Sequence, residues 1–462
     1  MPSPSPDPAA LLRSRRYVGL LILAAILGVP ISAAAFGFLA LVSGLQEWLF
    51  TDLPEALGFD GAPLWWPLPL LALAGVLVGL TIRYLPGRGG HSPADGFKAG
   101  GVPSPIELPG IALAALATLS LGAVLGPEAP LIALGAGLAG SAVRLARRDV
   151  PAQATAVVAA SGSFAAISTL LGSPLLGAFL LMEASGLGGP TLGVVLVPGL
   201  VAAGVGSLIF IGLDAWTGLG TYSLALPDVP PFAQPDLAQF GWALVIGLVA
   251  AVVGTGIRRL ALALRPHVER RLLLATPLVG VAVATLAIVY AQASGHNFSE
   301  VLFSGQNALG PLISNSATYS VGALVLLVAC KGLAYGVSLA GFRGGPVFPA
   351  MFLGAAGGIA LSHLPGLPLV PGVAMGIGAM SVVLLRLPLT SVLLATLLLA
   401  EDGLAVMPLV IVAVAVAYVA SARLTPPATA TPAAPTTATP AEARAQASPT
   451  PAQRPVSPER KR

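Results

Sequence analysis

A single glutamate, Glu128, stands in a run of small and apolar residues, between Pro127 and Pro130. Proline fits the first turn of a helix, where the N–H that it lacks has no partner, so we expect a helix to begin here. A carboxylate beside a helix start is stabilised by the free N–H groups and the positive end of the helix dipole. Deep in an apolar chain the same group is costly and usually functional. Glu128 is therefore either a cap at a membrane surface or a working group inside the membrane.

Composition places the chain in a membrane. Of its 462 residues, 56% are hydrophobic and 9% are charged, against about 25% charged in soluble domains, and the mean hydropathy is +0.89. We therefore expect an all-α polytopic membrane protein in a lipid bilayer. One cysteine, Cys330, and four scattered histidines offer no disulfide framework and no Cys/His metal site, so no cofactor is expected. The net charge of +4 comes from basic clusters at loops, which report topology and not a nucleic-acid partner.

The distribution of apolar residues divides the chain into five predicted regions. Residues 1–14 and the Pro/Ala/Thr-rich tail 423–462 are expected to be disordered. A first membrane repeat, 15–213, and a second, 237–422, are joined by a polar connection, 214–236. Arginines before the first apolar stretch and after the helix expected at about 237–257 predict that both termini lie in the cytoplasm, in a bacterial plasma (inner) membrane. Glycine and proline dominate residues 86–110, where we expect a loop entering a short helix near Ala94.

An internal repeat is visible in the sequence. The string Gly126-Pro127-x-x-Pro130 recurs as Gly345-Pro346-x-x-Pro349, and in both places Leu-Gly-Ala follows at the same distance. Pro174-Leu175 and Pro388-Leu389, each opening a helix, recur in the same order at nearly the same offset. Two such matches in order indicate duplication. Broken helices at matching places in two halves point to a binding site at the membrane midplane.

Two inverted repeats of broken and tilted helices would bring the helix starts after Gly126 and Gly345 together inside the membrane. Two positive helix ends with spare N–H groups, and no adjacent lysine, would hold an anion weakly enough for it to leave. A small inorganic anion is therefore the expected ligand. We expect an ionised Glu128 to block this site and protonation, which burial in a low dielectric favours, to release it.

These residues resemble the CLC family of chloride channels and chloride–proton antiporters, over about residues 15–422. LGPEAP (125–130) is similar to the GxEGP segment of the family, with Ala129 in place of its second glycine. GGPVFP (344–349) resembles the second pore segment, GSPLLGAFLLME (172–183) the NAPLAG…E stretch, and LPLTSVLL (387–394) the APLTG segment. The resemblance implies a CLC-like fold, a gating role for Glu128, and a homodimer with one pore per subunit. No cytoplasmic CBS-pair region is expected after the last span.

The resemblance also implies which residues would hold the anion. The GSGIP loop of the family, which supplies a serine, aligns by its proline with Gly89–Pro93, so that Ser92 falls two places late and Gly90 stands in its place. His91 lies between them and either donates to the anion or caps the short helix. Pro346 lacks an N–H, which leaves Val347 and Phe348 as donors of the second segment. The expected anion-binding residues are Ser92, Gly90, His91, Gly126, Pro127, Ala129, Val347 and Phe348.

Channel and exchanger remain alternatives at this point. Exchangers of the family carry a second, internal glutamate directly after the position of Glu183, and here that residue is Ala184, as in the channels. Glu183 itself is either a structural acid at the end of a helix or a proton-transfer site. The pore tyrosine of the closing helix has no match, since Tyr418 lies inside the last span. We therefore expect a passive, voltage-gated chloride channel-like protein, with proton-coupled antiport of chloride or another anion as the alternative.

Two further alternatives are open. Lys331 and Arg343 either draw anions toward the second segment or extend to an interface. An intramembrane enzyme would need a nucleophile with a base or paired carboxylates near Glu128. Ser161 and Ser163 have no histidine near them in the sequence, so we expect no enzyme.

Overall fold

The computed structural model of this chain describes residues 12–97, 101–146, 150, 152–186, 190–224, 226, 231–232, 234–399 and 402–425. The chain divides into two units, Met1–Leu424 and Thr425–Arg462, and all the helices described below belong to the first. Of the disorder expected for residues 1–14 and 423–462, residues 1–11 and those after residue 425 lie outside the described residues. Residues 423–424 are not disordered but belong to the last helix, Gly403–Leu424.

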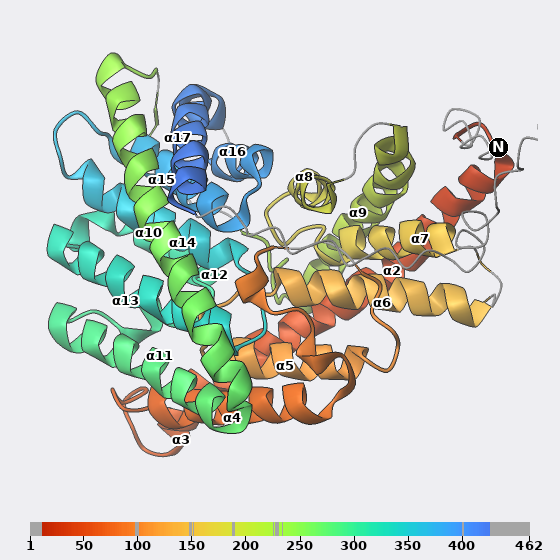
Figure 1. Cartoon of the computed structure of the whole chain (residues 1–462), viewed down its shortest axis with the longest axis horizontal. Coiled ribbons are helices and arrows are strands. Elements are labelled where there is room, and N and C mark those ends of the chain that lie inside the picture. Colours follow the sequence, from red (N-terminus) through yellow and green to blue (C-terminus); the bar gives the residue numbers. More distant parts are fainter. Residues whose placement is uncertain are drawn as a thin grey trace, which may run out of the picture. The chain divides into compact units, whose positions relative to one another are not determined.

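Helices make up nearly all of the described chain, as expected (Figure 1). The first half contains α2 (Arg15–Glu47), the π-helical turn η1 (Trp48–Asp52), α3 (Leu53–Ala56), α4 (Pro67–Tyr84), the short 3-10 turns η2 (Pro86–Gly89) and η3 (Pro93–Asp95), α5 (Leu108–Ser120), α6 (Glu128–Ala146), α7 (Ala152–Ala166), α8 (Pro174–Ser185) and α9 (Pro190–Thr217). The second half contains α10 (Leu237–Arg270), α11 (Leu272–Ser294), η4 (Phe298–Glu300), α12 (Gln306–Ser314), η5 (Ser316–Thr318), α13 (Val321–Gly341), α14 (Val347–Ser362), α15 (Leu369–Leu385), α16 (Pro388–Leu397) and α17 (Gly403–Leu424).

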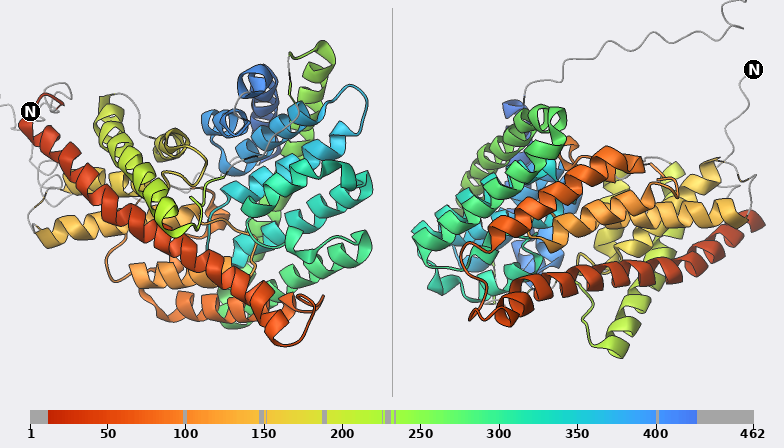
Figure 2. Two further views of the ribbon diagram at one scale, coloured as in Figure 1. Left: turned by 180° about the vertical axis from the view of Figure 1, so that it is seen from behind. Right: turned by 90° about the horizontal axis from the view of Figure 1, so that it is seen from below.

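The two halves pack their helices in the same pattern. In the first half α2 lies against α7 and α9, and α7 lies against α6 and α9. In the second half α10 lies against α15 and α17, and α15 lies against α14 and α17. Helices α4 and α11, which take matching places, pack on each other across the halves. Figure 2 shows the long helix α2 lying obliquely across the other helices of its half. The expected all-α fold of two repeats with broken helices is confirmed.

Glycines let the helix backbones touch at matching places in each repeat. A Cβ atom built on Gly135 of α6 would overlap the backbone of Gly162 in α7, and one built on Gly354 of α14 would overlap the backbone of Gly376 in α15. Small residues permit this close approach and are typical of helix contacts in membranes. Tight packing of α6 on α7 and of α14 on α15 fixes the directions in which the starts of α6 and α14 point.

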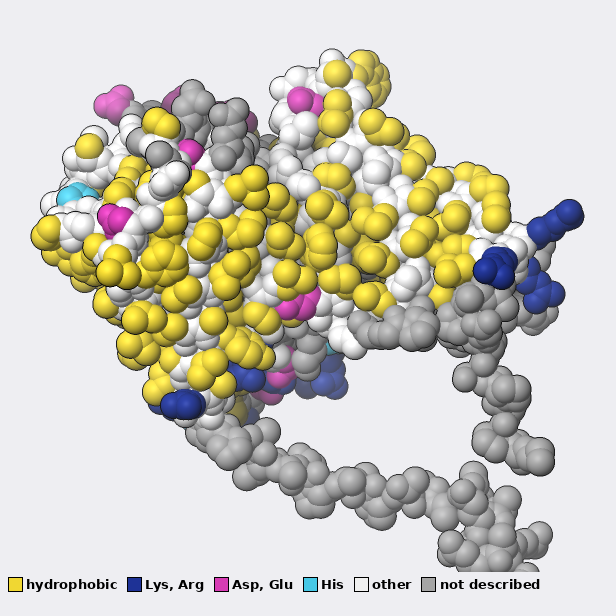
Figure 3. All heavy atoms as spheres, turned by 90° about the horizontal axis from the view of Figure 1, so that it is seen from above, with side chains coloured by type: hydrophobic (Ala, Val, Ile, Leu, Met, Phe, Trp, Pro, Cys, Tyr) yellow, Lys and Arg dark blue, Asp and Glu magenta, His cyan; other side chains and the backbone are white. Residues whose placement is uncertain are grey.

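The molecule is a multi-pass membrane protein. Within the part of the chain that the structure describes, eight helices are long and apolar enough to cross a bilayer by length and composition, α6 among them, and between them lie shorter apolar helices such as α8, α14 and α16. Figure 3 shows apolar side chains over most of the visible face, with lysine and arginine gathered near its edges. This distribution suits a surface in contact with lipid.

The structure corrects the sequence-based expectations at several boundaries. Helix α10 does not end near residue 257 but continues to Arg270, so most of the arginines expected after the helix lie on the helix itself. Arginine is a good helix former, and a capping box between Asp236 and Gln239 starts this helix firmly. The short helix expected near Ala94 is a single 3-10 turn. Helix α9 extends beyond residue 213, to Thr217.

Candidate functional site

The segments before α6 and α14 meet in the interior of the helical unit. The N–H of Gly126 donates to the carbonyl of Gly345 at 2.7 Å, and the N–H of Gly345 donates to the carbonyl of Gly126 at 2.6 Å. This pair is an isolated antiparallel bridge. Since α6 begins at Glu128 and α14 at Val347, the bridge holds the two helix starts beside each other.

Each helix start offers two amide donors. Helix α6 is preceded by Pro127 and has Pro130 in its first turn, so only the residues between them, Glu128 and Ala129, carry an N–H there. Helix α14 repeats this arrangement with Val347 and Phe348 between two prolines. N–H groups in a first helical turn lack intrahelical partners and lie at the positive end of the dipole. Four such donors on two adjoining helix starts form a site suited to an anion.

Glu128 places its own carboxyl in this site. The side chain is completely buried, and Oε1 accepts a hydrogen bond from the N–H of Val347, at the start of the opposite helix. Its Oε2 is buried and has no hydrogen-bond partner among the described residues. A Cβ atom built on either Gly126 or Gly345 would overlap this carboxyl. The carboxyl therefore lies over the glycine bridge. A side chain at either glycine position would occupy the space that the carboxyl takes.

Three of the expected anion ligands have no free N–H to offer. The N–H of Gly90 donates to the carbonyl of Gly87 at 2.9 Å, that of Gly126 donates to Gly345, and Pro127 carries none. Gly126 and Pro127 shape the segment that leads into α6. The amides that remain available to an anion or to Glu128 are those of Glu128, Ala129, Val347 and Phe348.

The loop that carries Gly90, His91 and Ser92 lies against the segment leading into α14. A Cβ atom built on Gly89 would meet Ala114 and the Cγ atom of Arg343. The Ser92 hydroxyl is buried without a hydrogen-bond partner among the described residues, whereas His91 is exposed. Among the described residues, the Ser92 hydroxyl therefore forms no hydrogen bond with Glu128 or with any other group. No side chain caps the turn η3 that follows Ser92.

Arg343 is almost completely buried beside this loop. Its Nη1 donates to the carbonyl of Phe342 at 3.1 Å, its Nε to that of Arg88 at 3.4 Å, and its backbone N–H to Thr118 Oγ1 at 3.3 Å. The side chain thus connects the loop 86–90 to the segment that enters α14. Of the two roles that the sequence left open for Arg343, extension to an interface is wrong.

Lys331 is fully buried in α13 and also does not extend to an interface. Its Nζ donates to the carbonyls of Glu300, Val301 and Leu302 at 2.9, 3.1 and 2.9 Å and to that of Phe303 at 3.4 Å. The Nζ also lies 4.4 Å from the centroid of the Phe352 ring. The ammonium group therefore holds the chain between η4 and α12 in place, and it has a cation–π contact with α14.

Glu183 is the cap of a helix in the opposite repeat. Its Oε1 accepts from the N–H of Leu389 at 3.0 Å, and its Oε2 accepts from the N–H and the hydroxyl of Thr390 at 2.7 and 2.6 Å. These donors belong to the first turn of α16. Of the two roles that the sequence left open, the geometry gives Glu183 that of a helix-end acid.

A residue that the sequence analysis overlooked contacts the start of α14. The hydroxyl of Tyr335, which is completely buried in α13, donates to the carbonyl of Pro346 at 2.9 Å. The sequence signalled only that a tyrosine lay in an apolar helix, and a buried tyrosine hydroxyl needs a hydrogen-bond partner.

The two serines considered as possible nucleophiles form hydrogen bonds with backbone carbonyls. Ser161 donates to the carbonyl of Val157, and Ser163 donates to that of Ile132.

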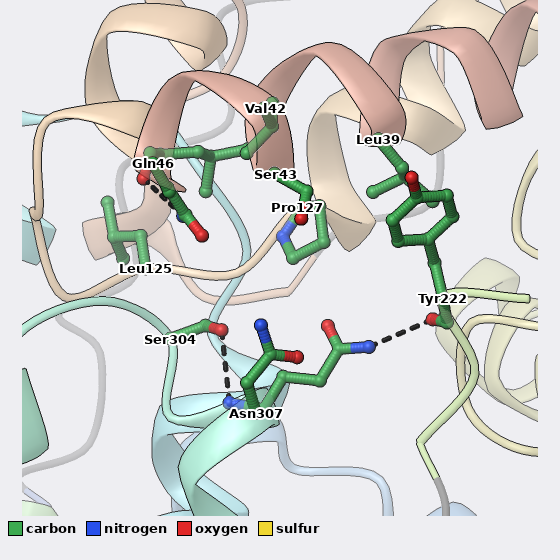
Figure 4. A pocket seen from close by; sticks show the side chains of 11 residues that line it. Leu39, Val42, Ser43, Gln46, Leu125, Pro127, Tyr222, Ser304 and Asn307 are labelled. Atoms are coloured by element: carbon green, nitrogen blue, oxygen red, sulfur yellow. Dashed lines mark hydrogen bonds between the residues drawn. The ribbon is translucent and has the colours of Figure 1, made fainter. Parts of the chain in front are cut away.

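A pocket opens beside Pro127, the residue directly before Glu128 (Figure 4). Gln46 on its wall donates to the carbonyl of Leu119 at 2.8 Å, and Gln306 donates to that of Tyr222 at 2.9 Å. Its polar lining carries no carboxylate or basic group among the described residues. The lining residues are Leu39, Val42, Ser43, Gln46, Leu119, Leu125, Pro127, Tyr222, Ser304, Gln306 and Asn307.

The fold and the site together define a polytopic membrane protein in which two broken helices direct their starts at one buried carboxyl. Comparison with known proteins agrees with this class. Residues 75–422 match the family described as voltage gated chloride channel. Because the match covers most of the chain, the protein belongs to this family, the CLC family, whose members transport anions.

Relatives in the curated collections are named for ion transport. The chain is 28% identical over 378 residues to "Putative ion-transport protein YfeO" of Salmonella schwarzengrund (strain CVM19633), covering 81% of this chain and 88% of that protein. It is 28% identical over 365 residues to the protein of the same name from Escherichia coli (strain SMS-3-5 / SECEC), covering 77% and 82%.

Solved structures share the fold at lower identity. A slow cyanobacterial Cl⁻/H⁺ antiporter superposes with a TM-score of 0.68 at 18% identity, over 88% of this chain and 94% of that one. A CLC-type fluoride/proton antiporter superposes with a TM-score of 0.66 at 20% identity, over 87% and 95%. At these identities the likeness concerns the architecture.

Proposed function

We propose that this protein conducts chloride or a similar small anion across a membrane through a pore that the Glu128 carboxyl opens and closes. The observation that carries the proposal is the hydrogen bond from the Val347 N–H to Glu128 at the meeting point of α6 and α14. An anion and an ionised carboxylate need the same donors, so they compete for one position. The permeant anion would be held by the amides of Ala129, Val347 and Phe348 after the carboxyl has left.

In this proposal the anion reaches Glu128 past the pocket beside Pro127 and past the loop that carries Ser92. The pocket beside Pro127 adjoins the end of α2 that lies farther from the basic N-terminal residues, and Ser43 and Gln46 belong to this end. The loop with Ser92 lies near the basic end of α10, because Asp95 in that loop forms an ion pair with Arg265. With a cytoplasmic N-terminus, the pocket is the outer approach and the Ser92 loop the inner one.

The gate responds to protons and to voltage for physical reasons. An ionised Glu128 is attracted to the two positive helix ends, whereas a protonated one has lost that attraction and yields to an anion. Flux should therefore rise as the external pH falls. A charge that moves through the membrane field also gains about 2.3 kcal/mol per 100 mV when it crosses the whole field, so part of this energy is available to bias the gate.

Passive conduction is the version of this function that we favour. Ala184 follows Glu183 where exchangers of the family carry an internal glutamate, and the carboxyl of Glu183 is engaged by three donors of α16. Tyr418 lies inside α17 and not beyond it. Proton-coupled antiport is the second candidate, because both solved structures compared above are antiporters, one of chloride and one of fluoride. A homodimer in a bacterial plasma membrane completes the proposal.

The test is anion flux from liposomes that contain the purified protein. Chloride, nitrate and fluoride are compared at neutral and acidic external pH, for the parent and for Glu128→Gln. The glutamine keeps the size of the side chain and mimics the protonated acid, so this variant should conduct at both pH values with little change between them. A variant whose flux remains as pH-dependent as that of the parent would show that Glu128 is not the gate. Glu55→Gln, at an exposed position on α3, serves as the control.

A further inference from the structure

One peptide group at the start of α14 is contacted at both of its ends. Its carbonyl, that of Pro346, accepts a hydrogen bond of 2.9 Å from the hydroxyl of Tyr335. Its N–H, that of Val347, donates to the carboxyl of Glu128. The three groups therefore form a continuous chain of hydrogen bonds from Tyr335 through one amide to the gate.

Hydrogen bonds in such a chain strengthen one another. A donor on the carbonyl oxygen draws electron density from the nitrogen and makes the N–H a better donor, by about 10–30% per bond in condensed-phase estimates. The effect matters most in a dry, low-dielectric interior. Tyr335, Pro346, Val347 and Glu128 are all buried, Glu128 and Tyr335 completely.

Tyr335 is also held rigidly enough to orient this amide. The residue after it, Gly336, packs so closely on α10 that an added Cβ atom would lie 2.9 Å from Leu260 Cδ2 and 3.3 Å from the carbonyl of Ile257. One turn further along α13, the hydroxyl of Ser338 accepts from the N–H of Val124 at 3.3 Å. Helix α13 is thus fixed on one side to α10 and on the other to the segment that leads into α6.

We propose that Tyr335 is a positioning residue of the anion site, which sets how strongly the Val347 amide binds both Glu128 and the permeant anion. This inference rests on the proposed function and adds a residue from a third helix to it. The hydroxyl does not itself face the anion, because it is directed at the far end of the peptide group. It acts by orienting and polarising the donor that gate and anion share.

The proposal predicts opposite effects in two backgrounds. With Glu128 present, Tyr335→Phe weakens the hold of the amide on the carboxylate, so the gate opens at higher pH than in the parent. With Glu128→Gln the gate is neutral, and Tyr335→Phe should weaken chloride binding about three- to tenfold, equivalent to about 0.7–1.4 kcal/mol. A purely structural role would lower stability and leave both quantities unchanged.

The experiment is calorimetric titration of chloride into the purified full chain. It compares Glu128→Gln with Glu128→Gln/Tyr335→Phe, and the matched control is Glu128→Gln/Tyr290→Phe. Tyr290 is equally buried, and its hydroxyl donates to Glu300 and not to the α14 start. We expect the control to bind chloride like Glu128→Gln alone. Equal affinities in all three variants would overturn the role of Tyr335, whereas an absence of chloride binding to Glu128→Gln itself would contradict the proposed function.

A second variant keeps the test decisive if Tyr335→Phe does not fold. Site-specific replacement of Tyr335 by 3-fluorotyrosine retains the ring and makes the hydroxyl a stronger donor. In the Glu128→Gln background this substitution should tighten chloride binding, in the direction opposite to the phenylalanine. An unchanged or weaker affinity in the fluorinated protein would overturn the proposal.

Discussion

Gly126 and Gly345 occupy equivalent places in the two repeats and exchange two backbone hydrogen bonds with each other, at 2.7 and 2.6 Å. Each stands two residues before the first residue of its helix, α6 or α14. A symmetric bond pair between equivalent residues places the pseudo-twofold relation of the repeats at this bridge. The side chains differ between the two starts, because α6 begins with Glu128 where α14 begins with Val347. The proposed gate is therefore a single carboxyl that has no counterpart at the equivalent position of the second repeat.

Gly345→Ala should open the gate without changing Glu128 itself. The three atoms nearest to an added Cβ at this position all belong to the Glu128 side chain. A flexible side chain can move away, so the carboxyl should leave the Val347 amide while the backbone bridge persists. We expect flux at neutral pH to rise by about tenfold, corresponding to about 1.4 kcal/mol of gate energy, with a weaker response to pH.

The control for this substitution is Gly357→Ala within α14, where an added Cβ meets nothing within 4 Å. That variant should keep the parental flux. In the Glu128→Gln background, Gly345→Ala should add little, since the displaced charge is already absent. If Gly345→Ala raised the flux as much in the Glu128→Gln background as in the parent, the proposed displacement of the carboxyl would be contradicted.

Passive conduction predicts that a pH gradient alone drives no anion movement. With equal chloride on both sides of a liposome and unequal pH, the voltage at zero current should stay at zero, because the anion gradient is zero. Proton-coupled exchange would move this voltage away from zero in proportion to the pH difference. Measuring it in the parent, with Glu128→Gln as the uncoupled reference, decides between the two proposed mechanisms.

Glu183→Ala should destabilise the protein and leave any proton coupling unaltered. The substitution removes three hydrogen bonds from the first turn of α16. Loss of a helix cap costs about 0.5–2 kcal/mol, so the unfolding temperature in detergent should fall. Thr390→Val removes one donor to the same carboxylate, and the two substitutions together should cost less than the sum of their separate effects. A change in the zero-current voltage under a pH gradient would instead assign Glu183 a part in proton transfer.

Lys331→Met should destabilise the loop between η4 and α12. Methionine has a similar length but donates no hydrogen bond, so four carbonyls lose their shared partner. Buried polar groups without partners cost about 1–3 kcal/mol each in the least compensated case. The same loop leads into Ser304 and Gln306 on the pocket wall. We expect faster proteolysis of this loop in the variant, and an unchanged cleavage pattern would contradict the assignment.

Much of this architecture could be predicted because its signals are local. Prolines at positions 127, 130, 346 and 349 fix where two helices begin and which amides stay free, and the repeat of this string identifies the two halves. The helix break at Gly172–Pro174 follows from the same chemistry, and α7 and α8 end and begin on either side of it. Such features depend on residues within one turn of each other.

The contacts that the sequence did not reveal join residues that are far apart in the chain or that lie on either side of a turn between two helices. Tyr335 reaches Pro346 because the chain between α13 and α14 turns back. Lys331 donates to carbonyls that lie 28 to 31 residues earlier in the chain. Neither partner has a spacing that a helix or turn would impose. The type of side chain signalled that a partner must exist, and only the packing identified it.

Ser92→Ala should alter anion preference while leaving stability nearly unchanged. The Ser92 hydroxyl is buried and has no hydrogen-bond partner among the described residues, so its removal breaks no bond and relieves the cost of an unsatisfied group. A hydroxyl that binds the permeating anion should favour small, strongly hydrated anions, because it replaces part of their hydration shell. We therefore expect the ratio of chloride to nitrate flux to fall in the variant, at an unfolding temperature equal to or above that of the parent. Ser141→Ala, which removes a hydroxyl bonded within α6, is the control and should leave the ratio unchanged. A lower unfolding temperature with unchanged selectivity would assign Ser92 to the structure of its loop and remove it from the pathway.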